Sequence, residues 1–241
     1  NDRLTAILQE RDNPFQTAIR VLASCIYGPT HPYGHPAVGS EDGVRHASRE
    51  DLVGFYRKWF TPANAALVLA GDLTEAEAKK LAQSAFGSWS GPRAENPAAP
   101  AATPIPERVV IVDKPNTPQS LMLVGQLSVK RSDPDFEQLN VMNQILGGLF
   151  SSRVNLNLRE KRGYTYGAFS AVVERREVAP LLAGAAVRTD ATGPSVEETL
   201  KEVKGMLAQP VSADELKLAK ESISRSLPAM LETTESTVGT V

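Results

Sequence analysis

Apolar residues recur at helical spacing near the start of the chain. Residues 2–11 place Leu4, Ile7 and Leu8 on one face. The stretch after Asn13-Pro14 carries a longer apolar stripe, formed by Phe15, Ala18, Ile19, Leu22 and Ile26. Proline suits the first position of a helix, and Gly28-Pro29 interrupts the pattern. The pattern predicts two consecutive helices before residue 28.

Capping signatures mark the starts of three more helices. Each places a hydroxyl residue three positions before a carboxylate, at Ser48–Asp51, Thr74–Glu77 and Ser212–Glu215. The first of these helices is expected to bury Leu52, Phe55, Tyr56 and Trp59. Two other helices are predicted, one opened by Asp133-Pro134 and one that begins near Ser195.

Runs rich in β-branched and aliphatic residues predict strands at 65–70, 108–113, 119–128 and 181–188, and Gly163 opens a fifth. Residues 31–44, which are rich in Pro, Gly and His, are expected to form a loop. Strands come in pairs and helices come in pairs, which favours an α+β fold.

Residues 91–107 read as a linker between two domains. Five prolines lie among alanines in this region, at Pro92, Pro97, Pro100, Pro104 and Pro106. The segment has neither a helical nor a strand period, which is typical of a semi-rigid connection. We therefore expect one domain over residues 1–90 and a second over residues 108–241.

Composition narrows the function classes. The 241 residues are 41% hydrophobic and 22% charged, as in an ordinary globular protein. A net charge of −2 excludes a general attraction to nucleic acid or anionic membranes, and no apolar run approaches the roughly 20 residues that span a bilayer. Cys25 is the single cysteine, which excludes an internal disulfide, and we expect an inert buried thiol.

The most informative stretch is residues 146–167. Gly147-Gly148 breaks one helix, and Ser151 or Ser152 is placed to cap a short second one. Arg159 lies near the end of that helix and Tyr166 just beyond the turn. A guanidinium and a phenol on one surface are suited to bind a peptide carbonyl through hydrogen bonds. The alternative is an exposed, salt-bridging arginine and a packing tyrosine.

Three further basic residues in this stretch, Arg153, Lys161 and Arg162, have two interpretations. They form either a solvated face or a wall that attracts acidic peptides.

Two series of motifs resemble the pitrilysin-type zinc metallopeptidases, which include insulin-degrading enzyme and the mitochondrial processing peptidase. The run Gly-Gly-x-x-Ser-Ser-Arg…Leu-Arg-Glu-Lys-Arg-Gly-x-x-Tyr is similar to the signature of that family's second domain. A second series of segments resembles the second half of that family's first domain. It consists of His31-Pro-Tyr-Gly34, Gly39, residues 51–56, Thr61-Pro-Ala-Asn64 and residues 67–72. The pieces occur in the family's order over nearly the whole chain.

The resemblance implies two pitrilysin-like domains, each a mostly antiparallel sheet with helices on one side, closing like a clamshell around a peptide that adds as a strand. Residues 1–90 would be the C-terminal half of the first domain. Residues 108–241 would be the second, substrate-gripping "inactive" domain, truncated at its C-terminal end. Both domains are expected to be incomplete in this chain, whose native N-terminus we expect upstream of Asn1.

The resemblance also assigns roles to residues. Arg159 corresponds to the family's substrate-binding arginine, and ungapped spacing places its tyrosine at Tyr166, with Tyr164 as the reserve. Such donors oppose the negative charge that develops on the scissile carbonyl. No catalytic residue is assigned in this chain.

The family binds zinc through H-x-x-E-H on a helix, together with a distant glutamate. His31, His35 and His46 are not part of such a motif. His31 and His35 have helical spacing, but Pro32 and Gly34 favour a structural loop over a metal site. We expect zinc in the parent protein or a partner, with its ligands upstream, and none bound by this chain.

These points predict a fragment of a zinc metallopeptidase, a peptide endopeptidase, that supplies the substrate-binding Arg/Tyr domain. The alternative is a non-catalytic partner subunit or scaffold of a heteromeric pitrilysin-type peptidase. Expected partners are a peptide substrate and either a zinc-bearing homologous subunit or a second copy, with no nucleic acid and no membrane span. A bacterial periplasm and a bacterial cytoplasm both remain open as the compartment.

Overall fold

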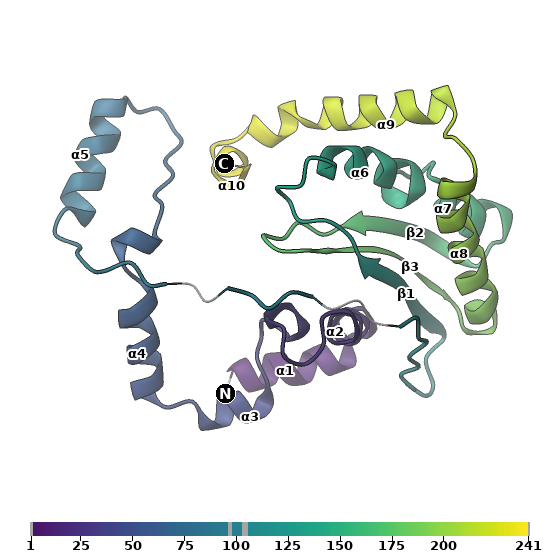
Figure 1. Ribbon diagram of the computed structural model, residues 1–241, viewed down its shortest axis with the longest axis horizontal. Coiled ribbons are helices and arrows are strands. Elements are labelled where there is room, and N and C mark those ends of the chain that lie inside the picture. Colours follow the sequence, from purple (N-terminus) through teal and green to yellow (C-terminus); the bar gives the residue numbers. More distant parts are fainter. Residues whose placement is uncertain (1, 96–97, 103–105, 241) are drawn as a thin grey trace. The chain divides into compact units, whose positions relative to one another are not determined.

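The computed structural model describes residues 2–95, 98–102 and 106–240 (Figure 1). The chain divides into two compact units. Unit 1 comprises Asn1–Glu41 and Ala99–Glu221, and unit 2 comprises Asp42–Ala98 and Ser222–Val241. In the described part of the chain, no helix is both long and apolar enough to cross a membrane.

Unit 1 holds most of the helical residues. Its elements are α1 (Asp2–Asp12), α2 (Pro14–Tyr27), the 3₁₀ turns η1 (Pro32–Gly34) and η5 (Thr189–Ala191), α6 (Phe136–Asn143), the π-helix η3 (Gln144–Gly148), α7 (Arg153–Asn155), the π-helix η4 (Leu156–Lys161), α8 (Thr192–Ala208) and α9 (Ala213–Ser226), which runs into unit 2. The predicted start of α2 is confirmed, because the Asn13 side chain accepts hydrogen bonds from the backbone N–H groups of Phe15 and Gln16.

Unit 2 consists of short helical elements. They are α3 (Glu41–His46), which begins at the last residue of unit 1's first segment, α4 (Arg49–Trp59), η2 (Pro62–Asn64), α5 (Glu75–Phe86), η6 (Pro228–Leu231) and α10 (Thr234–Thr240). The capping boxes predicted for α4 and α5 are both present. The helix α3 was not expected, since it lies partly in the segment predicted to be a loop.

Unit 1 contains an antiparallel sheet of three strands in the order β1-β3-β2. The strands are β1 (Gln119–Leu127), β2 (Thr165–Val172) and β3 (Pro180–Arg188). The central strand β3 pairs with both neighbours and carries small residues at its middle, where Gly184 faces Leu123 of β1. These three strands confirm the predictions for the second half of the chain.

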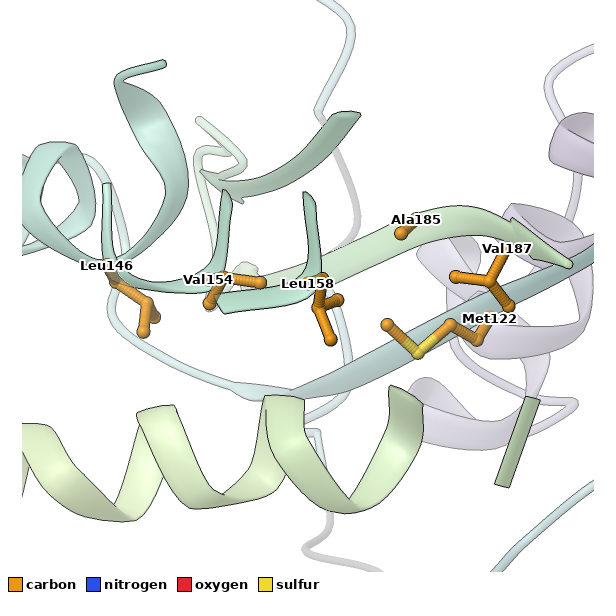
Figure 2. Close-up of a cluster of buried hydrophobic side chains, with 6 residues drawn as sticks. All are labelled: Met122, Leu146, Val154, Leu158, Ala185 and Val187. Atoms are coloured by element: carbon orange, nitrogen blue, oxygen red, sulfur yellow. The ribbon is translucent and has the colours of Figure 1, made fainter. Parts of the chain in front are cut away.

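One face of the sheet carries the core. Side chains from β1, β3, η3, α7 and η4 form a buried cluster that consists of Met122, Leu146, Val154, Leu158, Ala185 and Val187 (Figure 2). The other face receives α2. A Cβ atom on Gly125 of β1 would lie 2.9 Å from Leu22 of α2, and Phe15 lies 6.1 Å from Phe169 of β2. The glycine therefore permits the close approach of α2.

Two predicted strands do not form. Residues 65–70 and 108–113 have no assigned secondary structure and pair with no strand in the described chain, and Val109 and Ile111 are 85% and 87% exposed. A strand is completed only by hydrogen bonds to a neighbouring strand, whereas a helix satisfies most of its backbone internally. The strand propensity of these two segments was therefore not sufficient to form a strand.

The structure also bears on the predictions for the α4 stripe, for Cys25 and for the linker. The α4 stripe is not buried, because Leu52, Phe55 and Tyr56 are exposed and Trp59 is half-buried. Cys25 is half-buried rather than buried. The described residues of the 91–107 linker form neither helix nor strand, and Pro97 and Pro104 lie outside the described residues.

Candidate functional site

Arg159 lies on the π-helix η4, between a buried and an exposed residue. Leu158 is fully buried in the core and anchors the turn, while Glu160 faces solvent. The backbone N–H of Arg162 donates to the carbonyl of Asn157 at 3.0 Å, which is the i→i+5 bond of a π-helix. The arginine is therefore carried by a turn whose position is set by the core.

The Arg159 guanidinium has an unusual environment. Its Cζ atom lies 3.9 Å from the ring centroid of Phe150. Its Nη1 atom is 3.3 Å from Oε1 of Glu160, within the range of an ion pair, yet that buried nitrogen makes no hydrogen bond. The short distance is thus an attraction of charges without hydrogen-bond alignment. A buried donor without a hydrogen-bond acceptor is costly, and the charge of Glu160 offsets only part of that cost.

Tyr166 is displayed by a β-bulge. The pairing of β2 with β3 shifts between Thr165 and Ala168, so that β2 holds one extra residue there. The Thr165 hydroxyl donates to the carbonyl of Ala186 at 2.6 Å and accepts from the N–H of Gly167 at 3.1 Å. Tyr166 is 93% exposed. The alternative of a packing tyrosine therefore does not describe Tyr166.

Tyr164 does pack. Its half-buried side chain lies against the core cluster, and its backbone N–H donates to the carbonyl of Leu158 at 2.9 Å. No hydrogen bond is formed between Arg159 and either tyrosine among the described residues. The structure therefore orients the arginine and Tyr166 separately.

Asn155 is a residue that the sequence reasoning missed. Its side chain is buried and bridges two segments: Oδ1 accepts from the N–H of Ala168 in β2 at 3.0 Å, and Nδ2 donates to the carbonyl of Phe150. It thereby ties the Phe150 loop and the strand that carries Tyr166 to the helix before Arg159. A polar residue between Val154 and Leu156 in a core-facing turn was the available signal.

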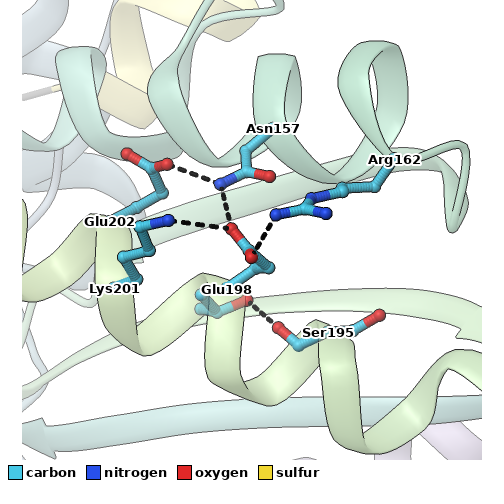
Figure 3. A network of polar contacts seen from close by, with 7 residues as sticks. Asn157, Arg162, Ser195, Glu198, Lys201 and Glu202 are labelled. Atoms are coloured by element: carbon cyan, nitrogen blue, oxygen red, sulfur yellow. Dashed lines mark hydrogen bonds and ion pairs between the residues drawn. The ribbon is translucent and has the colours of Figure 1, made fainter.

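A polar network fastens η4 to α8 (Figure 3). Nδ2 of Asn157 donates to Glu198 at 2.8 Å and to Glu202 at 2.6 Å, and Arg162 pairs with Glu198. The hydrogen bond from Asn157 is the main cause of a lowered pKa for Glu198, and the charge of Arg162 adds to it. The paired carboxylate of Glu198 therefore fastens the π-helix that carries Arg159 to α8.

A second ion pair fastens α7 to α9. Nε and Nη2 of Arg153 donate to the two carboxylate oxygens of Glu215 at 2.7 and 3.0 Å. These bonds lower the pKa of Glu215 to about 2 and raise that of Arg153. Two of the three cations in the predicted basic wall are therefore paired within the protein, which removes much of its attraction for an acidic peptide.

The histidines have structural contacts. Nδ1 of the buried His31 accepts from the N–H of Tyr33 at 3.0 Å and caps η1, and Nε2 of His35 lies 2.7 Å from the carbonyl oxygen of Pro29. His46 lies 3.1 Å from the carboxylate of Asp42. Within the described ranges, no three His, Cys, Asp or Glu side chains form a group that could hold a metal. The described residues do not fit a zinc site.

Three curated proteins are similar in sequence. An uncharacterized zinc protease of Streptomyces coelicolor is 29% identical over 68% of this chain and 38% of its own length. The uncharacterized zinc protease YmxG of Bacillus subtilis is 25% identical over 93% of the chain and 54% of its length. The non-peptidase homolog YmxG of Helicobacter pylori is also 25% identical, over 98% and 54%. The chain thus spans about half, or less, of these relatives.

Solved structures show the same fold. A peptidase M16 inactive domain from Pseudomonas fluorescens has a TM-score of 0.81 at 24% identity and covers all of this chain and 57% of its own. A protease from Helicobacter pylori has a TM-score of 0.86 at 19% identity, over 98% and 58%. A chain of Complex III2 from Candida albicans has a TM-score of 0.81 at 13% identity, over 98% and 58%.

The family described as the peptidase M16 inactive domain matches residues 46–223, which is most of the chain. This match agrees with the solved neighbours and with the motif order in the sequence. The chain belongs to the family of peptidase M16 inactive domains.

Proposed function

We propose that this chain supplies the peptide-gripping part of a zinc metallopeptidase, with Arg159 and Tyr166 holding the substrate main chain. The observation that carries the proposal is the Arg159 guanidinium, which is set on a core-anchored π-helix, makes no hydrogen bond through Nη1 and has a side chain that is 30% exposed. The bulge that exposes Tyr166 supports it, because bulges re-aim side chains next to functional sites.

The proposed chemistry is electrostatic. Arg159 donates to the carbonyl oxygen of the peptide bond under attack, and its charge opposes the negative charge that develops there. The phenol of Tyr166 adds a neutral donor from β2. Both groups are mounted on secondary structure rather than on free loops, which limits the reorganisation that binding requires.

A second candidate is a partner subunit without catalytic activity of its own. It is favoured by the Helicobacter pylori relative, which is named a non-peptidase homolog and aligns with nearly the whole chain. Zinc content separates the candidates. About one zinc per full-length chain indicates the peptidase, while zinc found only when a second polypeptide co-purifies indicates the subunit.

The test replaces Arg159 with alanine. In the active protein or complex, Arg159→Ala is expected to lower peptide turnover by about 10²-fold, the scale for one lost transition-state donor. Binding of a fluorescein-labelled, unstructured peptide to the chain should weaken in parallel. The matched control is Arg176→Ala, which removes an exposed guanidinium in the β2–β3 connection. Circular dichroism checks that both variants stay folded.

Two results contradict the proposal. If Arg159→Ala retains full turnover and peptide affinity, the arginine does not hold the substrate. If Arg176→Ala weakens binding equally, the peptide responds to general positive charge instead of to this site.

A further inference from the structure

Phe150 is a large aromatic side chain that faces solvent on an ordered backbone. It is 70% exposed. The backbone around it is fixed, because the N–H of Leu149 donates to Gln144, the N–H of Ser152 donates to Leu149, and the Asn155 side chain donates to the carbonyl of Phe150. The ring therefore lies at a fixed position on the surface, where its contacts can be examined.

The ring has a specific contact. The guanidinium of Arg159 lies over it, with Cζ 3.9 Å from the ring centroid, well inside the range of a cation–π interaction. The contact joins the loop after η3 to the π-helix η4, nine positions further along the chain. Asn155 supports both partners, since it precedes η4 and holds the Phe150 carbonyl.

The way in which Arg159 is held distinguishes it from its neighbours. Arg153 and Arg162 are held through their N–H groups, by the carboxylates of Glu215 and Glu198. Those contacts consume the donors that a ligand would need. Arg159 has its carboxylate contact, with Glu160, at Nη1 without a hydrogen bond; its Cζ lies over the Phe150 ring, and 30% of its side chain remains exposed.

We propose that Phe150 is a positioning residue whose ring holds the guanidinium of Arg159 by a cation–π contact, so that the exposed donors of Arg159 remain free for a peptide carbonyl. The inference rests on the proposed function for the identity of the acceptor. The carboxylate of Glu160 already lies 3.3 Å from Nη1, and without the ring to oppose it we expect this ion pair to draw the guanidinium toward solvent.

The test compares Phe150→Leu with Phe150→Tyr in the whole chain. The first variant keeps an apolar side chain and removes the ring, whereas the second keeps the ring. Nuclear magnetic resonance of the Arg159 Nε–Hε group reports the ring directly, since a proton above an aromatic face shifts upfield. Affinity for the fluorescein-labelled peptide reports the consequence.

The wild-type protein and Phe150→Tyr should show the upfield shift and equal peptide affinity. Phe150→Leu should lose the shift and bind the peptide about 5-fold more weakly, the scale of one cation–π contact. Adding Glu160→Gln to Phe150→Leu should restore part of that affinity, because the competing carboxylate is gone.

The outcomes separate the two proposals. If the wild-type Arg159 signal has no upfield shift, or Phe150→Leu binds the peptide normally while Arg159→Ala does not, the positioning role is wrong and the proposed function stands. If Arg159→Ala binds normally, the proposed function is wrong, and the positioning role fails with it. A loss of affinity in Phe150→Tyr as large as in Phe150→Leu also overturns the role of the ring.

Discussion

Leu158 in unit 1 and Leu81 in unit 2 are both leucines on helical segments, yet the first is 0% and the second 60% exposed. The contrast is general. Among the described residues, every apolar side chain that is buried lies in unit 1. Unit 2 forms capped helices without a buried apolar core in the described chain. Caps and local hydrogen bonds are thus sufficient to begin a helix, while a core requires a sheet or helix to cover the apolar face.

The largest expected effect tests the core of unit 1. Leu158→Ala should lower the free energy of unfolding of unit 1 by about 2–5 kcal/mol, because it leaves a cavity beneath η4. Leu81→Ala, on an exposed face of α5, should change stability by no more than about 0.5 kcal/mol. Because two units need not unfold together, the measurement is urea-dependent hydrogen exchange of β3 and α5 amides.

If Leu81→Ala lowered the free energy of unfolding as much as Leu158→Ala does, the contrast between the two units would be wrong. Such a loss would show that unit 2 covers its apolar surface in solution, either within the chain or against another molecule.

The second expected effect concerns two glycines. A Cβ atom on Gly147 would lie 2.3 Å from the backbone nitrogen of Ser170, so Gly147→Ala should destabilise unit 1 by about 1–3 kcal/mol through overpacking of η3 against β2. Gly54, inside α4, has no atom within 4 Å of such a Cβ. Gly54→Ala should therefore stabilise unit 2 by about 0.5–1 kcal/mol through helix propensity alone.

Thermal unfolding followed by circular dichroism measures both glycine variants. A neutral Gly147→Ala would contradict the close packing of η3 on the strand.

The smallest expected effect is a pH dependence in unit 1. The folded-state pKa of Glu215 is about 2, below its ordinary value of 4.5, because Arg153 donates to it. The folded state therefore binds the proton less readily than the unfolded state. The resulting stability is present above about pH 4.5 and is lost as the pH falls towards 2. Since the side chain is one-third exposed, we expect about 1 kcal/mol.

Hydrogen exchange of α7 amides between pH 5 and pH 3 checks this expectation. Glu215→Gln should remove that part of the pH dependence. The matched control is Glu75→Gln in unit 2, which disrupts an exposed pair with Lys79 and should leave the pH profile unchanged. Identical profiles for wild type and Glu215→Gln would contradict the role of the ion pair.

Part of the candidate site could be read from the sequence. The glycine pair, the basic helix and the spacing to Tyr166 identified the segment, and the motif order identified the family that residues 46–223 match. The sequence did not indicate Asn155 or Phe150. The bridging role of Asn155 and the role proposed for Phe150 depend on contacts with Ala168 and Arg159 that arise when the loop, the π-helix and β2 come together.

The sequence by itself determined the helix starts and several turns, because caps and glycines act on hydrogen bonds within a few residues. Ser48 and Thr74 cap their helices as predicted, α2 begins at Pro14 as predicted, and Gly163 adopts a positive φ of 63° before β2. Only the tertiary structure decided which apolar stretches become strands and how the side chains of Arg159 and Tyr166 are exposed. Strand pairing and the bulge at Tyr166 require partners distant in sequence, and the Phe150–Arg159 contact depends on how the loop after η3 lies against η4; helical and strand periodicity does not record these contacts.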